Sequence, residues 1–312
     1  MSAERYIIIA DVSCDLSKEI RDRIGMKEYV QGHIHFDDGR DFATTLDWEN
    51  ISREDFYKQL SNKKSKITTA PGNAEQCYEL FKKYIEQGYA VLSMSLSSTI
   101  STTYNLTCVA ADRLRAEFPD CKIYCFDSAR MSGAFGLLTI YAHLMQRDGK
   151  SFDEVIGWLE ENKCKVHQMG PIDDLIFVAR RGRLTMGKAI MGNFAGVKPM
   201  GDCNADGYTT VLTKVKGIGK ALDLTVEYAK ATAVEPENQI ILIAHSDREL
   251  YANTLKAKLQ ESLSPKEVWV TDVFCGCGAN VGPGMVGVYY LGEKISNDLA
   301  AEKAIMTKLQ GK

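Results

Sequence analysis

The sequence predicts an α/β protein, and three observations support this fold class. Strand-like apolar runs alternate with helix-length amphipathic segments through the first half of the chain, a pattern typical of a parallel sheet wound by helices. After about residue 165, strand-like runs with longer connections predominate. The length of 312 residues also exceeds what one core usually supports. We therefore expect a Rossmann-like, mostly parallel sheet domain at 1–165 and an α+β domain with a largely antiparallel sheet at 166–312.

The first half supplies the strands and helices of the parallel sheet. Residues 6–10 are a continuous apolar run, as in a strand buried on both faces, and Ser13 or Asp15 is expected to cap a helix at 16–24. Alternating residues around an Asp-Gly pair predict a small hairpin insertion near 29–46. The remaining expected elements are helices at 47–63, 74–87, 103–118, 134–146 and 151–163, and strands at 91–96 and 122–126.

The second half is expected to form strands at 208–212, 239–244, 266–274 and 287–291 and helices at 221–232, 248–261 and 297–309. Residues 174–179 are read as a further strand. Residues 278–287 hold four glycines and a proline, a composition that favours either a tight connection between two strands or a loop that approaches a ligand.

Composition narrows the classes of function. A net charge of −3 and a pI near 6.0 argue against a nucleic-acid surface. The N-terminal apolar run is too short for a signal peptide or a membrane span, so we expect a cytoplasmic protein. The nine cysteines are expected to be free thiols, and no cysteine pair has a second Cys/His pair at zinc-finger spacing. No metal site is predicted.

Common nucleotide and hydrolase motifs are incomplete or missing. Residues 182–189 have the Gly-x4-Gly-Lys spacing of a phosphate-binding loop, but Ala189 stands where Ser or Thr would hold Mg²⁺. No Gly-x-Gly-x-x-Gly follows the first strand, and no Gly-x-Ser-x-Gly is present. The five histidines form no ligand pair. The sequence therefore disfavours nucleotide hydrolysis, dinucleotide binding and serine hydrolase chemistry.

Residues 97–104 carry six Ser or Thr side chains in eight positions, where a strand gives way to a helix. Hydroxyl groups and free backbone N–H groups at a helix N-terminus suit a carboxylate or phosphate oxygen. A helix cap alone would need only one or two of them. Residues 11–13, 68–69 and 127–128 also follow strands, so we expect these segments to converge on one site.

Seven short motifs, read in order, resemble those of the DegV family over roughly residues 6–291. They are Asp11-Val12-Ser13-Cys14-Asp15-Leu16, Thr68-Thr69-Ala70-Pro71-Gly72, Ser97-Ser98-Thr99-Ile100-Ser101-Thr102-Thr103-Tyr104, Asp127-Ser128, Arg181-Gly182-Arg183-Leu184, Val197-Lys198-Pro199-Met200 and Gly282-Pro283-Gly284. The resemblance implies a two-domain protein that holds a long-chain fatty acid such as palmitate, stearate or oleate, without a cofactor. Some members of that family are binding subunits that present the fatty acid to a separate fatty acid kinase subunit.

The resemblance also implies site residues. Thr68 and Ser101 would grip the carboxylate, and the other candidate ligand-binding residues are Ser98, Thr102, Arg183 and Asn280. Asn280 stands where the family usually has His, and Lys216 lies near a frequent Arg. Asn can still donate a hydrogen bond.

Two alternatives remain open at the level of sequence. The first alternative to fatty acid binding is a phosphoryl- or acyl-transfer enzyme with Ser101 as nucleophile and Asp11 or Asp127 as base or metal ligand. The second is a purely regulatory interaction module. For the fatty-acid hypothesis we expect an apolar tunnel in the first domain, drawn from residues that serve equally well in an ordinary core. These are Ile100, Phe135, Leu137 and Leu138.

Overall fold

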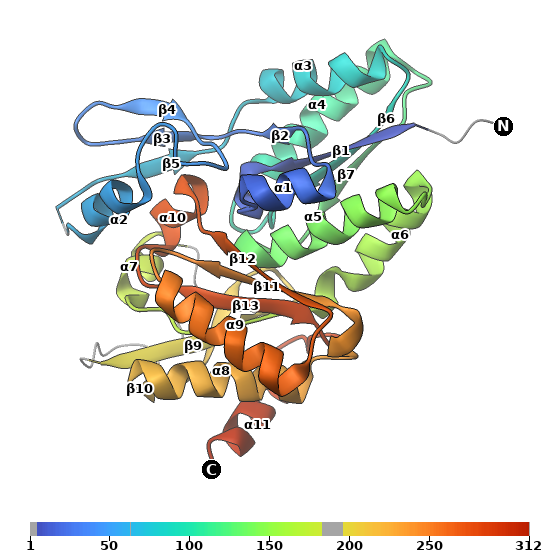
Figure 1. Ribbon diagram of the computed structural model, residues 1–312. Coiled ribbons are helices and arrows are strands. Elements are labelled where there is room, and N and C mark those ends of the chain that lie inside the picture. The colour runs from blue at the N-terminus through green and yellow to red at the C-terminus, as the bar shows by residue number, and fades with distance from the viewer. Residues whose placement is uncertain (1–4, 63, 183–195, 312) are drawn as a thin grey trace.

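The computed structural model describes residues 5–62, 64–182 and 196–311, and it is organised around two larger sheets (Figure 1). Sheet A has four parallel strands in the order β2, β1, β6, β7. Their bounds are β1 (Tyr6–Asp11), β2 (Tyr29–Val30), β6 (Ala90–Ser95) and β7 (Ile123–Asp127). The parallel sheet expected from the first half of the sequence is confirmed.

Helices cover both faces of sheet A. One face packs against α3 (Ala74–Ile85) and α4 (Thr103–Glu117), and the other against α5 (Ser132–Arg147). The N-terminus of α3 is fixed by a reciprocal capping box between Asn73 and Gln76. The remaining helical segments of this half are η1 (Val12–Cys14), α1 (Lys18–Ile24), α6 (Phe152–Asn162) and η2 (Lys163–Lys165).

The prediction that Ser13 or Asp15 caps α1 was wrong. Ser17 occupies the N-cap position, and its side chain makes no capping hydrogen bond. Asp15 instead adopts a left-handed conformation, with φ 50°, and its buried carboxyl group is bonded elsewhere.

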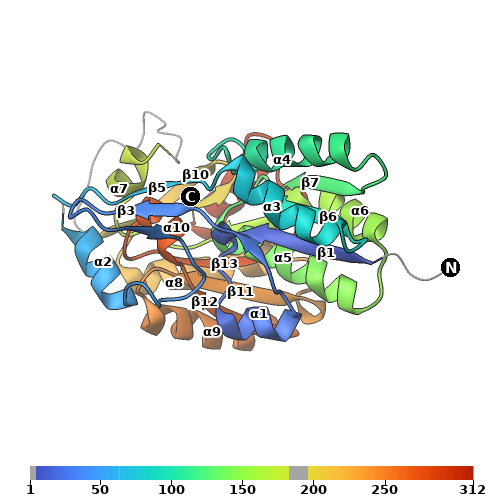
Figure 2. The same ribbon diagram turned by 90° about the horizontal axis from the view of Figure 1, so that it is seen from above.

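A small antiparallel sheet, sheet B, stands beside the C-terminal edge of sheet A (Figure 2). It contains β3 (His33–His35), β4 (Asp41–Ala43) and β5 (Thr68–Ala70), and α2 (Arg53–Ser61) lies in the same segment. The hairpin near 29–46 is therefore present. The sequence reading missed that β5 joins it as a third strand.

Sheet C carries the second half of the chain, in the order β12, β11, β13, β8. Two of its three pairings are antiparallel, and β11 with β12 is parallel, so the largely antiparallel sheet is confirmed. Its strands are β8 (Val166–Met169), β11 (Ile240–His245), β12 (Glu267–Asp272) and β13 (Val286–Leu291). A separate antiparallel ribbon joins β9 (Val197–Cys203) to β10 (Thr209–Lys216).

Helices of the second half pack on the outer face of sheet C (Figure 1). They are α8 (Ile218–Thr232), α9 (Glu249–Leu263) and α11 (Ala300–Leu309), with the short η4 (Pro236–Asn238) between α8 and β11. None of the helices in the described part of the chain is long and apolar enough to cross a membrane.

Two segments of the second half differ from the sequence-based expectation. Residues read as a strand form α7 (Leu175–Arg180), which Asp174 caps by accepting from the Phe177 amide. The glycine-rich run is not a loop between strands, because α10 (Cys275–Val281) occupies its first part and only Gly282-Pro283-Gly284 turns toward β13. The phosphate-loop-like run lies, from residue 183 on, outside the described residues.

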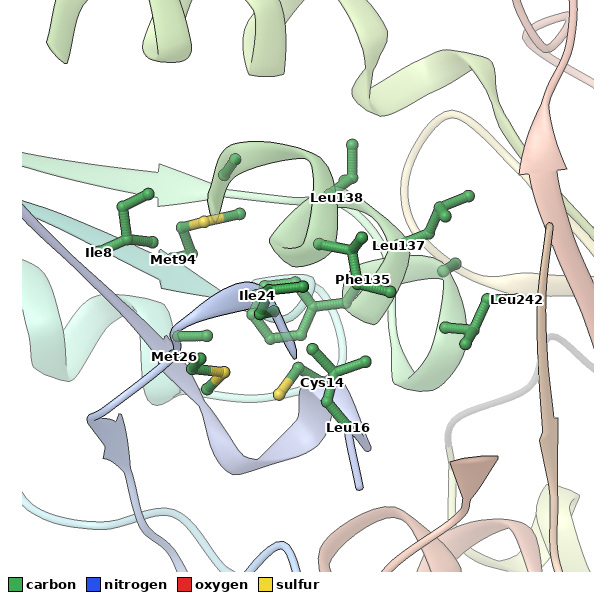
Figure 3. Close-up of a cluster of buried hydrophobic side chains, with 14 of the residues drawn as sticks. Ile8, Cys14, Leu16, Ile24, Met26, Met94, Phe135, Leu137, Leu138 and Leu242 are labelled. Carbon is green, nitrogen blue, oxygen red and sulfur yellow. The ribbon is translucent and has the colours of Figure 1, made fainter. Parts of the chain in front are cut away.

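Helix α5 lies between the two larger sheets (Figure 1). Its side chains share one continuous apolar core with residues of both sheets, and Figure 3 shows Leu137 reaching toward Leu242 of β11 and Phe135 toward Cys14. Phe135, Leu137 and Leu138 are fully buried in this core. Sheet A and sheet C are thus joined through α5, and the cleft described next opens where the carboxyl ends of sheet A meet α10.

Candidate functional site

A cleft opens at the carboxyl-terminal edge of sheet A, where β1 and β6 run into their connecting segments. It is bounded by these segments, by the N-termini of α4 and α5, by sheet B and by α10. It encloses about 770 Å³ of space free of protein atoms, its open mouth included. Parallel sheets place their ligand sites at this edge, so the segments after residues 11 and 95 meet there as expected.

One wall of the cleft carries hydroxyl groups at two helix N-termini. Ser101 and Thr103 stand at the start of α4, and Ser132 is the first residue of α5. Ser101 Oγ lies 2.9 Å from Thr103 Oγ1 and accepts a hydrogen bond from the Thr103 amide at 3.2 Å. Helix N-termini carry a partial positive charge, so this wall favours an anionic group.

Another wall of the cleft comes from sheet B and α10. Asn280 on α10 donates from Nδ2 to Thr69 Oγ1 on β5 at 3.0 Å and to the Gly276 carbonyl at 3.0 Å. Thr44 accepts from the Gly32 amide at 2.9 Å. Both walls therefore present neutral hydrogen-bonding groups, and none of the described residues that line the cleft is Lys, Arg or His.

The floor of the cleft contains a buried carboxyl group. Asp11 is 2% exposed and accepts from the amides of Ser13, at 2.7 Å, and Leu96, at 2.8 Å. Burial raises the pKa of Asp11 to about 6, although these two amides favour the charged form. Asp11 thereby holds the ends of β1 and β6 together beneath the hydroxyl wall.

A second buried carboxyl group supports the wall from behind. Asp15 accepts from Ser132 Oγ at 2.6 Å and from the Phe274 amide at 2.9 Å. Burial raises the pKa of Asp15 to about 7. Asp15 and Ser132 both have positive φ angles, near 50°, which non-glycine residues adopt at some energetic expense. This strained pair ties η1, α5 and the approach to α10 together.

The rest of the cleft lining is mainly apolar. Val12, Val30, Ile100, Met131 and Val281 contribute side chains from both halves of the chain. A ligand that combines an anionic end with an apolar body would find partners for both parts in this lining.

Comparison with known proteins assigns the family. The sequence model of the family described as "Uncharacterised protein, DegV family" matches residues 5–293. The chain belongs to the DegV family. A DegV domain-containing protein of Clostridium perfringens is 31% identical over 290 residues, which make up 93% of this chain and 98% of that relative.

Solved structures of DegV proteins share the fold. A DegV family protein from Thermus thermophilus, reported for fatty acid binding, has a TM-score of 0.82 at 22% identity, covering 92% of this chain and 99% of that one. The fatty acid kinase B3 protein of Streptococcus pneumoniae, loaded with linoleic acid, has a TM-score of 0.79 at 17% identity, covering 93% and 100%. The α/β architecture is therefore that of the DegV structures.

The structure brings together some of the residues predicted from the DegV resemblance. Ser101 and Asn280 both line the cleft, Ser101 at the start of α4 and Asn280 on α10. Ser98 and Thr102 do not line it: the Ser98 amide donates to Asp127 at 3.2 Å, and Thr102 is an exposed N-cap residue. Arg183 lies outside the described residues.

Thr69, and not Thr68, faces the cleft. Successive side chains of a strand point to opposite faces, and β5 turns Thr68 to solvent and Thr69 toward Asn280. The sequence analysis identified the Thr-Thr pair, but without the strand pairing it could not tell which of the two side chains faces the cleft. It also missed Thr44, Thr103 and Ser132 as cleft residues, although each lies just after a strand or at the start of a helix.

The structure separates the residues named for the alternative in which Ser101 is a nucleophile. The hydroxyl partner of Ser101 is Thr103, and no histidine in the described part of the chain lines the cleft. Of the two carboxyl groups considered as base or metal ligand, Asp11 lines the cleft, where it accepts from the Ser13 and Leu96 amides. Asp127 accepts from the Ser98 and Ala129 amides and does not line the cleft. No group of three or more His, Cys, Asp or Glu suited to a metal ion occurs among the described residues.

Proposed function

We propose that this DegV protein binds one long-chain fatty acid, such as palmitate, stearate or oleate, in the cleft. The carboxylate would lie between Ser101 and Thr103 on one wall and Thr69 and Asn280 on another. The observation that carries the proposal is that one cleft combines hydroxyl and amide groups with apolar side chains in its lining. A fatty acid combines the same two kinds of group.

The polar walls suit a carboxylate in particular. Charge-assisted hydrogen bonds from hydroxyl and amide donors are stronger than neutral ones, and the N-terminus of α4 adds a favourable dipole. Of the residues named by the DegV resemblance, we assign the carboxylate to Ser101 and replace Thr68 by Thr69. Asn280 supports Thr69, since its two Nδ2 hydrogens go to Thr69 Oγ1 and the Gly276 carbonyl and leave the Thr69 hydroxyl proton for the carboxylate. Contact with Arg183 remains a prediction.

The acyl chain would supply most of the binding free energy. Each buried methylene contributes about 0.8 kcal/mol, so a chain of roughly a dozen methylenes outweighs one or two hydrogen bonds. The expected tunnel residues Phe135, Leu137 and Leu138 are close-packed in the core, and only Ile100 of that set lines the cleft. We therefore propose that the acyl chain enters beside Ile100, Val12 and Val30.

We further propose that the bound fatty acid is presented to a separate fatty acid kinase subunit in the cytoplasm. The fold shared with the fatty acid kinase B3 protein supports this partnership, and nine free cysteines suit a reducing compartment. Incubation of the loaded protein with a fatty acid kinase catalytic subunit and ATP tests it. Consumption of ATP that depends on this chain is expected, and ATP consumption unchanged by this chain would contradict it.

Native mass spectrometry after gentle purification tests fatty acid binding directly. We expect one C16 or C18 fatty acid per chain, and reloading of the delipidated protein by added palmitate or oleate. Absence of a co-purified lipid together with no uptake of either acid would refute the proposal. Labelling of Ser101 by a fluorophosphonate probe would instead favour the alternative in which Ser101 is a nucleophile.

A further inference from the structure

The loop that leads to Ser101, residues 96–101, is fixed along its length; we call it the headgroup loop. The Leu96 amide donates to Asp11 at 2.8 Å, and the Ser98 amide donates to Asp127 at 3.2 Å. Between them, the Ser97 amide donates to the Arg130 carbonyl at 2.8 Å. Neighbouring strand ends of sheet A thus hold the first half of the loop.

Thr99, the next residue of the headgroup loop, is hydrogen-bonded by the second half of the chain. Thr99 Oγ1 donates to the Asp206 carbonyl at 2.9 Å, and the Tyr208 hydroxyl donates to the Thr99 carbonyl at 2.9 Å. Asp206 and Tyr208 belong to residues 204–208, which connect β9 to β10; we call this segment the ribbon turn. Two hydrogen bonds therefore fix the peptide that directly precedes Ile100 and Ser101.

The ribbon turn is itself well defined. The Gly207 amide donates to the Asn204 carbonyl at 3.1 Å, and the Tyr208 amide donates to Asn204 Oδ1 at 2.8 Å. Gly207 has φ +88° and presses against the headgroup loop so closely that a Cβ atom would overlap Ser97 Oγ. The turn and the loop are in direct contact.

A buried arginine joins the two segments. Arg130 is fully buried; its carbonyl accepts from Ser97, while its guanidinium donates to the Asn204 carbonyl at 3.2 Å and the Val166 carbonyl at 3.2 Å. The same residue therefore holds the headgroup loop through its backbone and the ribbon turn through its side chain. Movement of the ribbon turn would be passed to the headgroup loop.

We infer that Tyr208 is a positioning residue for the carboxylate of the ligand, acting through Thr99 to orient Ser101. The inference rests on the proposed function. Ile100 and Ser101 follow Thr99 and both line the cleft. Hydrogen-bond strength falls steeply with distance and angle, so a headgroup loop released from the ribbon turn would grip a carboxylate less well.

A double-mutant cycle on palmitate affinity tests the inference. The four proteins are the wild type, Tyr208→Phe, Ser101→Ala and the double variant. Tyr208→Phe removes one hydroxyl and is expected to weaken palmitate binding roughly three- to tenfold. If Tyr208 acts through Ser101, the double variant binds palmitate within about twofold of Ser101→Ala, because the two effects are coupled.

Two further variants accompany the cycle: one disrupts the same contact from the headgroup loop, and one is a control. Thr99→Val removes the bond to the Asp206 carbonyl and should also weaken palmitate binding, as Tyr208→Phe does. Tyr124→Phe is the control: it removes a surface hydroxyl that donates to Glu160, and neither residue lines the cleft. The palmitate affinity of this variant should equal that of the wild type.

Each result decides a separate claim. Unchanged affinity of Tyr208→Phe, additive losses in the double variant, or an equal loss in Tyr124→Phe would overturn the role of Tyr208. If the wild type itself takes up no palmitate, the proposed function fails, whatever the variants do.

Discussion

At the scale of single residues, strand register decides which side chains meet the ligand. Ser101 and Asn280 were predicted from the sequence and line the cleft, whereas Thr68 was predicted and faces solvent. A motif gives the order of residues but not the face on which each lies. Only the pairing of β5 with β3, which aligns Thr69 with Ile34, settles that Thr69 contacts Asn280.

The two threonines therefore form a matched pair for mutation. Thr69→Val keeps the shape of the side chain and removes the hydroxyl at the cleft, so palmitate affinity should fall roughly three- to tenfold. Thr68→Val makes the same chemical change on the solvent face and should leave the affinity unchanged. Titration with palmitate measures both; an effect of Thr68→Val alone would show that the family pattern, and not the register seen here, identifies the contact.

The buried carboxyl groups predict a pH dependence of stability. Because the folded pKa values of Asp11 and Asp15, about 6 and 7, exceed those of unfolded aspartates, the folded state binds more protons between about pH 4 and 7. These groups favour folding fully below the unfolded pKa, and that contribution is lost as pH rises through 6 and 7.

Asp15→Asn should remove part of this pH dependence. Asn accepts from the Phe274 amide, can bond Ser132 and tolerates positive φ, so the geometry survives without a charge. Between pH 5 and 8 the wild type should lose on the order of a few kcal/mol of unfolding free energy relative to the variant. Urea unfolding across this range measures it, with the exposed Asp120→Asn as control; parallel pH curves for wild type and Asp15→Asn would contradict the assignment.

At the scale of elements, the alternation of strands and helices predicted sheet A well, because its strands are apolar runs buried on both faces. The same reasoning failed at α10, where glycine content was read as a loop. Gly278 lies inside the helix, and a Cβ there would stand 2.7 Å from Tyr57 Oη and 2.8 Å from Phe56 Cε1. The glycine is required by a neighbour distant in sequence, which local patterns do not reveal.

Two helical glycines should therefore respond oppositely to alanine. Gly278→Ala should destabilise the protein by about 1–3 kcal/mol through overpacking against α2. Gly157 in α6 is exposed, with no atom within 4 Å of a new Cβ, and Gly157→Ala should stabilise by about 0.5–1 kcal/mol. Thermal and urea unfolding of both variants check this, and stabilisation by Gly278→Ala would show that α10 packs differently.

At the scale of the whole molecule, the sequence predicted two domains, and we propose the boundary at residues 165 and 166. The sequence could not show that α5 serves both sheets, since its side chains are apolar around most of the helix and carry no sign of which neighbour each meets. One core runs from Ile8 through α5 to Leu242 (Figure 3). The two sheets are therefore expected to be thermodynamically coupled.

Calorimetry should accordingly show a single cooperative unfolding transition for the delipidated protein, because separating the sheets would expose the faces of α5. Residues 1–165 alone should bind hydrophobic dyes through the surface left by sheet C. Two resolved transitions in the full chain would show that the halves fold independently.

We propose that the cleft lined by Ser101 and Asn280 holds a fatty acid carboxylate. A crystal structure of the protein loaded with palmitate tests it most directly. We expect a carboxylate oxygen about 2.6–3.2 Å from Ser101 Oγ, with Thr69 and Asn280 also beside the carboxylate, and the acyl chain running among Val12, Val30 and Ile100. Palmitate bound with its carboxylate outside this cleft, or a cleft that stays empty at saturating palmitate, would contradict it.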